Sequence, residues 1–462
     1  MVLMTNHSAT AIVILSTSVV PWLFVYAPVL YAQWQLVLSR PKPEVLVSNS
    51  LAGVKELPEC PGCKNEVGKE SSKREAPRRI EHARGRPRSI DTSSHFCPNL
   101  KCVYHGWVGL GNIRSNGHPN GGRWRQLECE VCGKTFMETH NTIFYGKKYP
   151  AETIWRALKC LAEGVGIRKT ARIFDLDPNT VATWLAQAGA HRANVSHYLL
   201  HDLKLTQVQV DELWAQLGRR KGKEKVKYWV WVGVDAPTKL WLATVIGDRS
   251  QACAQLLIHA IVALLAPGCM PLFTSDQWSA YATALLCHFG QWLPTPRTHA
   301  RGRPPKPRWM PDPNLLYAQV VKQREHGRVV AVTQRVIFGS LKTIEKVLQA
   351  AGSQVINTAF IARLNLTIRE HVAALGRKVQ DIAKTVAGLR HQLSLAQAYH
   401  NFCLPHSALR VPLPAALPTR GNGSPKKWQP RTPAMAAGVT IRVWRMEELL
   451  LLRIPPWQQT SA

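Results

Sequence analysis

The stretch LTQVQVDELWA, residues 205–215, decides the fold of the central part of the chain. Polar and apolar side chains alternate along its first half, which predicts a β-strand that ends at Asp211. A second short apolar run, MPLFTSD at residues 270–276, predicts another strand that ends at Asp276. Two strands that each end in an aspartate are the starting point for the rest of the chain.

The residues between these two strands predict an α/β domain. YWVWVGVDAPTKLWLATVIGDR, residues 228–249, predicts a hairpin with its turn at residues 236–239. SQACAQLLIHAIVALLAPG, residues 250–268, predicts a helix that crosses over to the strand at residues 270–276. Strands that alternate with a long helix are typical of a mixed α/β sheet covered by helices.

Asp211 and Asp276 are candidate catalytic residues. If the two strands are neighbours, carboxylates at the same edge of the sheet can share divalent cations, because Mg²⁺ and Mn²⁺ prefer oxygen ligands. Two such ions about 3.5–4 Å apart support phosphoryl transfer. A strand-end aspartate also often caps a turn, so this alternative stays open.

Two cysteine pairs predict a structural zinc site. Cys97 and Cys102 lie in CPNLKC, and Cys129 and Cys132 lie in CEVC, about 25 residues further on. Two pairs on tight turns supply four thiolates and leave no open coordination position, so the site is expected to be closed and structural. The remaining pair, Cys60 and Cys63, could bind a second ion or be a solvent-exposed coincidence.

Residues 151–198 predict a helix-turn-helix. A first amphipathic helix covers residues 151–163, a second covers residues 166–174, and Asp177 caps a third that begins at Pro178. The first residues of such a third helix can read bases in the major groove, and basic residues on the second can contact phosphates. The predicted base readers are Asn179, Thr180 and Thr183, and the predicted phosphate contacts are Arg168 and Lys169. Three short helices can also form a packing module without DNA.

The charge of the chain favours DNA as the partner. The 462 residues contain 59 Lys and Arg against 29 Asp and Glu, a net charge of +30. Such a surplus indicates a polyanionic partner, with double-stranded DNA ahead of an anionic membrane surface. HARGRP occurs at residues 82–87 and again at 299–304, and its core is similar to an AT-hook, although a solvated basic loop has the same composition.

The N-terminal leader, residues 1–39, has a different character. It carries no charged residue from Ser8 to Ser39 and is long enough to span a bilayer, and Arg40 and Lys42 after it would keep the rest of the chain in the cytoplasm. We therefore expect either membrane contact through residues 8–39 or a start codon placed too early. The body of the protein is expected in the cytoplasm, with the nucleoid.

The order of these features resembles the bacterial insertion-sequence transposases, in particular the insertion-sequence-one type of DDE transposase. The resemblance covers the chain from about residue 90 to the C-terminus. It rests on GLGNIRSNGHPNGGRWRQLECEVCGKTF, GIRKTARIFDLDPNTVATWL, VQVDELWA, LFTSD and INTAFIARLNLTIREH. It implies a zinc ribbon, a helix-turn-helix and a ribonuclease-H-like catalytic domain. It also implies Mg²⁺- or Mn²⁺-dependent cleavage and transfer of element ends, with a homo-oligomer assembled on DNA.

One residue departs from this resemblance. The family uses two aspartates and one glutamate, and Asp211 and Asp276 match the aspartates. The glutamate is expected in the segment INTAFIARLNLTIREH at the position of Ala362. Glu370 and Glu345 are poor substitutes, because the first lies off the required helix face and the second belongs to an amphipathic surface helix. A transposase of weak or no activity is therefore expected, or a catalytically defective copy that still binds DNA as a regulator or inhibitor.

The expected organisation is a multidomain α/β chain. Residues 294–313 are expected to be loop-like, 328–338 a hairpin, 341–352 a short helix and 357–402 a long helical stretch. The predicted units are the leader at 1–39, a basic linker at 40–93, a zinc-ribbon-like domain at 94–146, a helix-turn-helix at 147–200, a ribonuclease-H-like domain at 201–403 with an insertion at about 294–356, and a basic, Pro-rich tail at 404–462.

Overall fold

A computed structural model describes most of the chain from residue 76 onward. The described residues are 45–46, 76–81, 90–218, 228–293, 307–326, 328–352, 355–377, 381–419, 421 and 423–457. The apolar leader, Cys60, Cys63 and both HARGRP segments lie outside them. Within these ranges, no helix has the length and apolar character that a membrane span requires.

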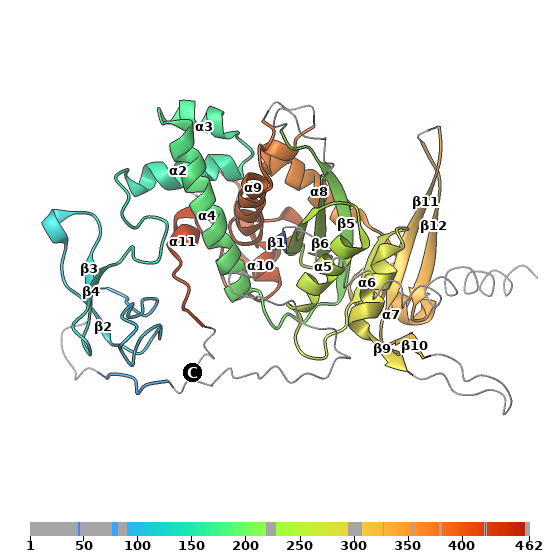
Figure 1. Cartoon of the computed structure of the whole chain (residues 1–462), viewed down its shortest axis with the longest axis horizontal. Coiled ribbons are helices and arrows are strands. Elements are labelled where there is room, and N and C mark those ends of the chain that lie inside the picture. Colours follow the sequence, from blue (N-terminus) through green and yellow to red (C-terminus); the bar gives the residue numbers. More distant parts are fainter. Residues whose placement is uncertain are drawn as a thin grey trace, which may run out of the picture.

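A mixed β-sheet forms the centre of the molecule (Figure 1). Its strand order is β1-β7-β6-β5-β8-β11-β12. β5, β6 and β7 are antiparallel neighbours, whereas β8 runs parallel to β5, and β11 runs parallel to β8. The strands are β1 (Val45–Leu46), β5 (Gln207–Ala215), β6 (Tyr228–Asp235), β7 (Trp241–Gly247), β8 (Leu272–Asp276), β11 (Tyr317–Glu325) and β12 (Arg328–Phe338).

Helices cover both faces of this sheet. α5 (Gln251–Val262) and α6 (Ala280–Phe289) pack on the face that carries Val208 and Val210 of β5. The other face carries Leu213 and is covered by α8 (Ala359–His371) and α9 (Val386–Ala398), while α7 (Leu341–Ala350) packs on the same side of β11. The alternation of side chains along β5 therefore separates two apolar layers.

Three helices before the sheet pack on one another and on α9, which is one of the helices that cover the sheet. They are α2 (Ala151–Ala162), α3 (Ile167–Ile173) and α4 (Pro178–Leu199), which confirms the helices predicted at these positions. α4 lies along α9, and a Cβ atom added at Gly189 would come within 2.7 Å of the backbone of His391. Glycine at this position allows the two helices to approach closely.

The cysteine-bearing segment forms a small separate sheet. Its strands β2 (Ile113–Ser115), β3 (Gln126–Cys129) and β4 (Thr135–Met137) are antiparallel, and η1 (Pro119–Gly121) lies between the first two. The turns before β2 and after β3 carry the four cysteines that the sequence singles out. Figure 1 shows this sheet at the opposite end of the molecule from β11 and β12.

The C-terminal segment is ordered and folds back over the other parts. α10 (Pro433–Ala436) and α11 (Met446–Leu451) pack near α2, α4 and the π-helical turn η3 (Tyr399–Cys403). Glu447 forms an ion pair with Arg123 at 2.7 Å, and the Arg453 guanidinium donates a hydrogen bond to the backbone carbonyl of Glu138. Trp457 packs edge-on against Trp107. The segment that we expected to be only a basic, Pro-rich tail therefore joins the cysteine-bearing sheet to the helices.

Four local predictions are wrong. β5 does not end at Asp211 but continues to Ala215, because its second half pairs with β6. Residues 328–338 are one strand rather than a hairpin, and their partner is β11. The stretch 357–402 is divided between α8, the short turn η2 (Ala373–Leu375) and α9. The loop-like region 294–313 contains a strand, β10 (Arg308–Pro311), paired with β9 (Gly290–Leu293).

The remaining predictions near the sheet are confirmed. The hairpin turn lies between β6 and β7, and α5 crosses over to β8, which ends at Asp276. Two short elements complete the described residues: η4 (Ser407–Leu409), and the hairpin of β13 (Val411–Leu417) with β14 (Lys426–Gln429).

Candidate functional site

The four predicted cysteines come together in a four-cysteine cluster (Cys97, Cys102, Cys129 and Cys132). Their sulfur atoms all lie within 4.8 Å of one another. The Sγ atoms of Cys97 and Cys132 are 3.6 Å apart, and those of Cys102 and Cys129 are 3.9 Å apart. A tetrahedron with zinc–sulfur bonds of about 2.3 Å has edges of about 3.8 Å, so the cluster has the dimensions of a zinc site.

The turns that carry the cysteines hold their side chains in place. Gly133 follows the second pair with φ +67°, a conformation that favours glycine, and its backbone N–H donates to the carbonyl of Cys129. The side-chain amide of Asn112 donates to the Cys129 sulfur at 3.4 Å. Cys97, Cys102 and Cys129 are buried and Cys132 is exposed. Four thiolates would fill the coordination positions of a tetrahedral ion, as in structural zinc sites.

A second group of ligand-type side chains lies at one edge of the main sheet. This carboxylate cluster consists of Asp211, Glu212 and Asp276, each of which offers an oxygen within 4.8 Å of the others. β5 pairs with β8 so that Gln209 is opposite Thr274, and two residues further on the same register places Asp211 level with Asp276. The sheet therefore brings together the two aspartates that the sequence predicts.

Helix α8 contributes a polar residue to this cluster. The side-chain amide nitrogen of Asn365 donates a hydrogen bond to Oδ2 of Asp211 at 2.8 Å. Asn365 is only 9% exposed, and its Oδ1 has no hydrogen-bond partner in the described structure. A buried amide oxygen without a partner is costly, so an oxygen-seeking cation beside Asp211 would satisfy it.

Burial and like charge raise the pKa of Asp211 to about 7. Loss of hydration is the largest cause, and the charges of Glu212 and Asp276 act in the same direction. The backbone N–H of Glu212 and the charge of Lys322 lower the pKa of Asp211 and offset part of the increase. A cation would relieve this repulsion, because it lowers the energy of the charged carboxylates.

Glu212 is a member of the cluster that sequence reasoning missed. Arg249 forms an ion pair with one carboxylate oxygen of Glu212 at 2.5 Å, and the Tyr281 hydroxyl donates to the other at 2.9 Å. The Arg249 guanidinium in turn packs against the rings of Trp229 and Trp278, with centroids at 5.0 and 5.3 Å. Both oxygens of Glu212 are therefore already bonded, which suits a fixed counter-charge better than a freely available ligand.

The position of the expected third acid is on α8, the helix that carries Asn365. Ala362 is exposed on α8, one turn before Asn365, and supplies no oxygen. Glu370 is exposed near the C-terminal end of the same helix, and Glu345 is exposed on α7. Neither belongs to the carboxylate cluster, as expected from their helix faces.

The residues present fit a divalent cation. Asp211, Asp276 and the unpartnered Oδ1 of Asn365 are hard oxygen donors on three different elements, which is the donor type that Mg²⁺ and Mn²⁺ take. The family resemblance implies a carboxylate from α8, but position 362 holds alanine. The oxygen that α8 offers is instead the neutral amide oxygen of Asn365.

The predicted DNA-reading residues lie at the exposed start of α4. Oδ1 of Asp177 accepts from the backbone N–H groups of Asn179 at 2.8 Å and of Thr180 at 3.3 Å, so Asp177 caps the helix as predicted. Asn179 and Thr183 are exposed, and the Thr183 hydroxyl donates to the backbone carbonyl of Asn179. Their side chains stand at the N-terminal end of the helix, where contact with another molecule is sterically open.

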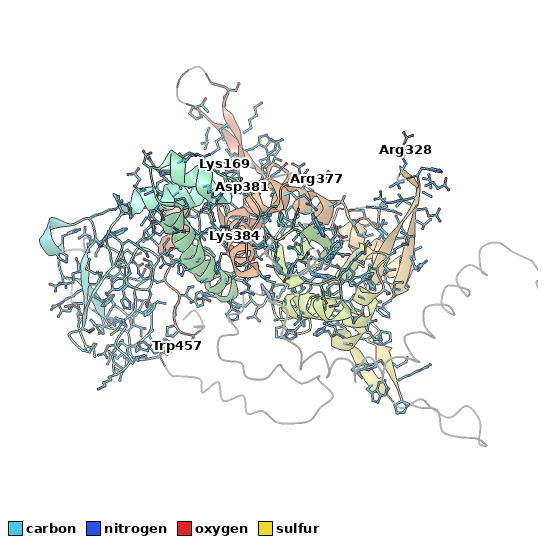
Figure 2. All side chains as sticks on the ribbon, turned by 45° about the horizontal axis from the view of Figure 1, so that its top comes forward. Lys169, Arg328, Arg377, Asp381, Lys384 and Trp457 are labelled. Carbon is cyan, nitrogen blue, oxygen red and sulfur yellow. The ribbon has the colours of Figure 1, made fainter. Side chains whose placement is uncertain are left out.

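The two predicted phosphate contacts differ in their surroundings. Arg168 is exposed on α3, whereas Lys169 forms an ion pair with Asp381 at 3.1 Å (Figure 2). Lys169 would have to leave Asp381 to reach a phosphate, at a small cost because the pair is exposed.

Comparisons with known proteins add little to this geometry. No family model matches the chain, and no curated protein matches it. Among solved structures, the chain is similar to the one titled "Crystal structure of the Mos1 Strand Transfer Complex", at 14% identity, with 29% of this chain and 53% of that chain covered and a TM-score of 0.12. The chain thus spans about half the length of that protein, and the TM-score is too low to bear on fold or function.

Proposed function

We propose that the protein binds double-stranded DNA and carries a divalent-cation site for phosphodiester cleavage and strand transfer, in the manner of a transposase. The observation that carries the proposal is that Asp211 and Asp276, on the adjacent parallel strands β5 and β8, offer carboxylate oxygens within 4.8 Å of each other, while Asn365 of α8 donates a hydrogen bond to Asp211. Three antiparallel strands followed by two parallel ones fit the ribonuclease-H-like domain that the sequence resemblance implies.

In this proposal Asp211 and Asp276 hold the cation from the sheet, and Asn365 holds it from α8. A bound pair of ions would activate the attacking oxygen and stabilise the leaving oxygen. Asn365 also keeps the Asp211 carboxylate in one orientation through its hydrogen bond. Arg249 neutralises Glu212, so that the cluster carries less net negative charge towards an approaching phosphate.

Ala362 sets the expected level of activity. A neutral amide binds a cation less tightly than a carboxylate, so the second ion of a pair should be held poorly. The loss of one electrostatic stabiliser of a transition state costs about 10²–10³ in rate. We therefore propose that cleavage is weak or absent while DNA binding, which uses other residues, persists.

A second candidate function is a DNA-binding regulator or inhibitor of transposition. The exposed alanine at position 362 favours it, because this position supplies no acid and no other acid of α8 reaches the cluster. Both functions use the same DNA contacts: α2, α3 and α4 as a helix-turn-helix, with Asn179, Thr180 and Thr183 as base readers. They differ only in whether the carboxylate cluster catalyses DNA cleavage.

The four-cysteine cluster has a structural part in this proposal. Zinc bound by the four thiolates would hold β2, β3 and β4 as a zinc ribbon beside the DNA-binding helices. Element ends and target DNA are the proposed partners, with a homo-oligomer on DNA in the cytoplasm. The predicted domain limits remain part of this proposal, as does membrane contact through residues 8–39.

The test of the function is direct. Purified full-length protein is mixed with labelled duplexes that carry its own element ends, and binding and strand transfer are measured with Mg²⁺ and with Mn²⁺. Sequence-dependent binding with weak cleavage supports the first function, and binding without cleavage supports the second. Absence of DNA binding would contradict both.

A matched pair of variants separates base reading from charge. Asn179→Ala with Thr180→Ala should remove the preference for element ends but leave non-specific binding nearly unchanged. Arg168→Ala with Lys169→Ala should lower the affinity for DNA of every sequence by a similar factor and reduce the salt dependence of binding. Unchanged preference after the first pair would contradict the role given to α4.

A further inference from the structure

β11 and β12 continue as a two-stranded ribbon (residues 321–326 and 328–334) beyond the point where β8 ends. The last residue of β11 that pairs with β8 is Val320, opposite Asp276. From residue 322 to residue 334 nearly every described side chain is exposed on either face. Figure 1 shows the ribbon extending past the helices, and Figure 2 places Arg328 at its tip. An uncovered two-stranded ribbon is marginally stable by itself.

The composition of the ribbon indicates a polyanionic partner with apolar surface. Between residues 321 and 335 the only acidic residue is Glu325, against four basic residues: Lys322, Arg324, Arg328 and Arg335. Val329, Val330 and Val332 are 45%, 52% and 58% exposed. Duplex DNA offers both phosphates for the basic side chains and apolar sugar surface in its grooves, and two-stranded ribbons are known to enter those grooves.

The register divides the ribbon into two faces. Val320 pairs with Gln334 and Lys322 pairs with Val332, so these side chains point to one side, where Gln334 donates to the carbonyl of Ile356. Arg324 is two residues beyond Lys322 on β11. The register shifts just before Arg324, but the extra residue, Val330, belongs to β12, so Arg324 keeps the side of Lys322. Arg335 pairs with Gln319, which donates to the carbonyl of Trp278, and therefore points to the opposite side.

The face with Lys322 and Arg324 continues the face of the carboxylate cluster. Val320 is in register with Asp276, and Asp276 is level with Asp211, whose carboxylate points towards α8. The charge of Lys322 is close enough to Asp211 to lower the pKa of that carboxyl. A duplex bound at the two aspartates and extending along this edge would therefore meet Lys322 first and Arg324 next.

We infer that this face of the ribbon is a second contact surface for duplex DNA, next to the carboxylate cluster and separate from α4. This inference rests on the proposed function. In it, Lys322 and Arg324 bind phosphates, and Val332 covers the apolar wall of a groove. The ribbon thereby fixes the direction in which DNA leaves the cluster.

The experiment measures binding of full-length protein to a 40-base-pair duplex without element sequences, by fluorescence anisotropy across a series of salt concentrations. The test variant is Lys322→Ala with Arg324→Ala. The control variant is Arg328→Ala with Arg335→Ala. It removes the same charge from β12 on the opposite face, because Arg328 pairs with Glu325 and Arg335 pairs with Gln319. Circular dichroism confirms that both variants fold.

The test variant should lose about tenfold in affinity, and its salt slope should fall by about two, since each lost phosphate contact changes the slope by about 0.9. The control should change the slope by less than half a unit. Equal effects of the two variants, or no effect of the first, would overturn the inference. A change in molecular mass of the test variant with unchanged DNA affinity would overturn it too, by assigning the face to a second copy of the chain.

The proposed function is tested separately. The pair Asn179→Ala and Thr180→Ala reports on element-end preference through α4. If that preference is lost as expected while the ribbon variant binds normally, the ribbon inference fails and the proposed function stands. If the unaltered protein binds no duplex, both fail.

Discussion

The four-cysteine cluster and the carboxylate cluster both consist of side chains of the types that can hold a metal ion, but the chain builds them differently. The cysteines come from two turns of one small sheet, and Cys102 and Cys129 are 27 residues apart. The carboxylate cluster draws on β5, β8 and α8, and Asp211 lies 154 residues before the Asn365 that binds it. The first cluster is therefore complete within one local unit, whereas the second depends on how three separate elements pack together.

The largest expected effect is at the four-cysteine cluster. Cys129→Ser should reduce bound zinc from about one ion per chain to none, because three thiolates cannot close the tetrahedron. Structural zinc contributes about 10–16 kcal/mol in small zinc peptides, so residues 94–146 should become susceptible to protease. Metal analysis and limited proteolysis measure this. Cys160→Ser, outside the cluster, is the control, and zinc retained by Cys129→Ser would contradict the assignment.

The next effect is at the sheet edge. Asp276→Asn should lower the affinity for Mn²⁺ by about 10²-fold or more, since it removes one of the two charged ligands. Glu345→Gln, an exposed charge on α7, should leave the affinity unchanged. Isothermal titration of the full chain decides between them, and equal affinity in Asp276→Asn and the parent would place the cation elsewhere.

A smaller effect is expected on α8. Asn365→Ala removes both the oxygen and the hydrogen bond to Asp211, and loss of such a partner costs about 10–100-fold in metal affinity. Asn365→Asp should instead raise the affinity for Mn²⁺, because a carboxylate replaces an amide. If both variants bind Mn²⁺ as the parent does, Asn365 is only a packing residue.

The smallest effect concerns pH. The pKa of Asp211 is raised to about 7 in the metal-free protein, so protons compete with the cation below neutral pH. The apparent affinity for Mn²⁺ should fall by up to about tenfold per pH unit from pH 7 to pH 6 and level off above pH 8. In Asp211→Asn this slope should disappear, and a slope that persists would identify another group as the source.

Local patterns predicted most of what is confirmed. Cysteine spacing and the cap at Asp177 act within a few residues, so they predicted the four-cysteine cluster and the start of α4. The patterns of residues 205–211 and 270–276 predicted two strands that carry Asp211 and Asp276 at their ends. The end of β5 was placed too early, because the pairing of residues 212–215 with β6 is not visible in one strand.

Long-range contacts account for what the sequence left out. The alternation placed Glu212 on the opposite face from Asp211, and its place in the cluster depends on Arg249 and Tyr281 from later elements. Asn365 reads in the sequence as one more polar position on a helix. Its importance appears only when α8 packs on β5. The sequence did not predict β11, because this strand is recognised by its pairing with β12 and β8, and those contacts are not visible in a local pattern.

The central claim is that Ala362 alone separates the carboxylate cluster from strong activity. The direct measurement is Mn²⁺-dependent cleavage of labelled element-end DNA by the unaltered protein and by Ala362→Glu, at equal DNA occupancy. The variant should cleave at least about 10²-fold faster than the parent, since the added carboxylate completes the ligands of the second ion. Rapid cleavage by the unaltered protein, or no gain in Ala362→Glu, would contradict the claim.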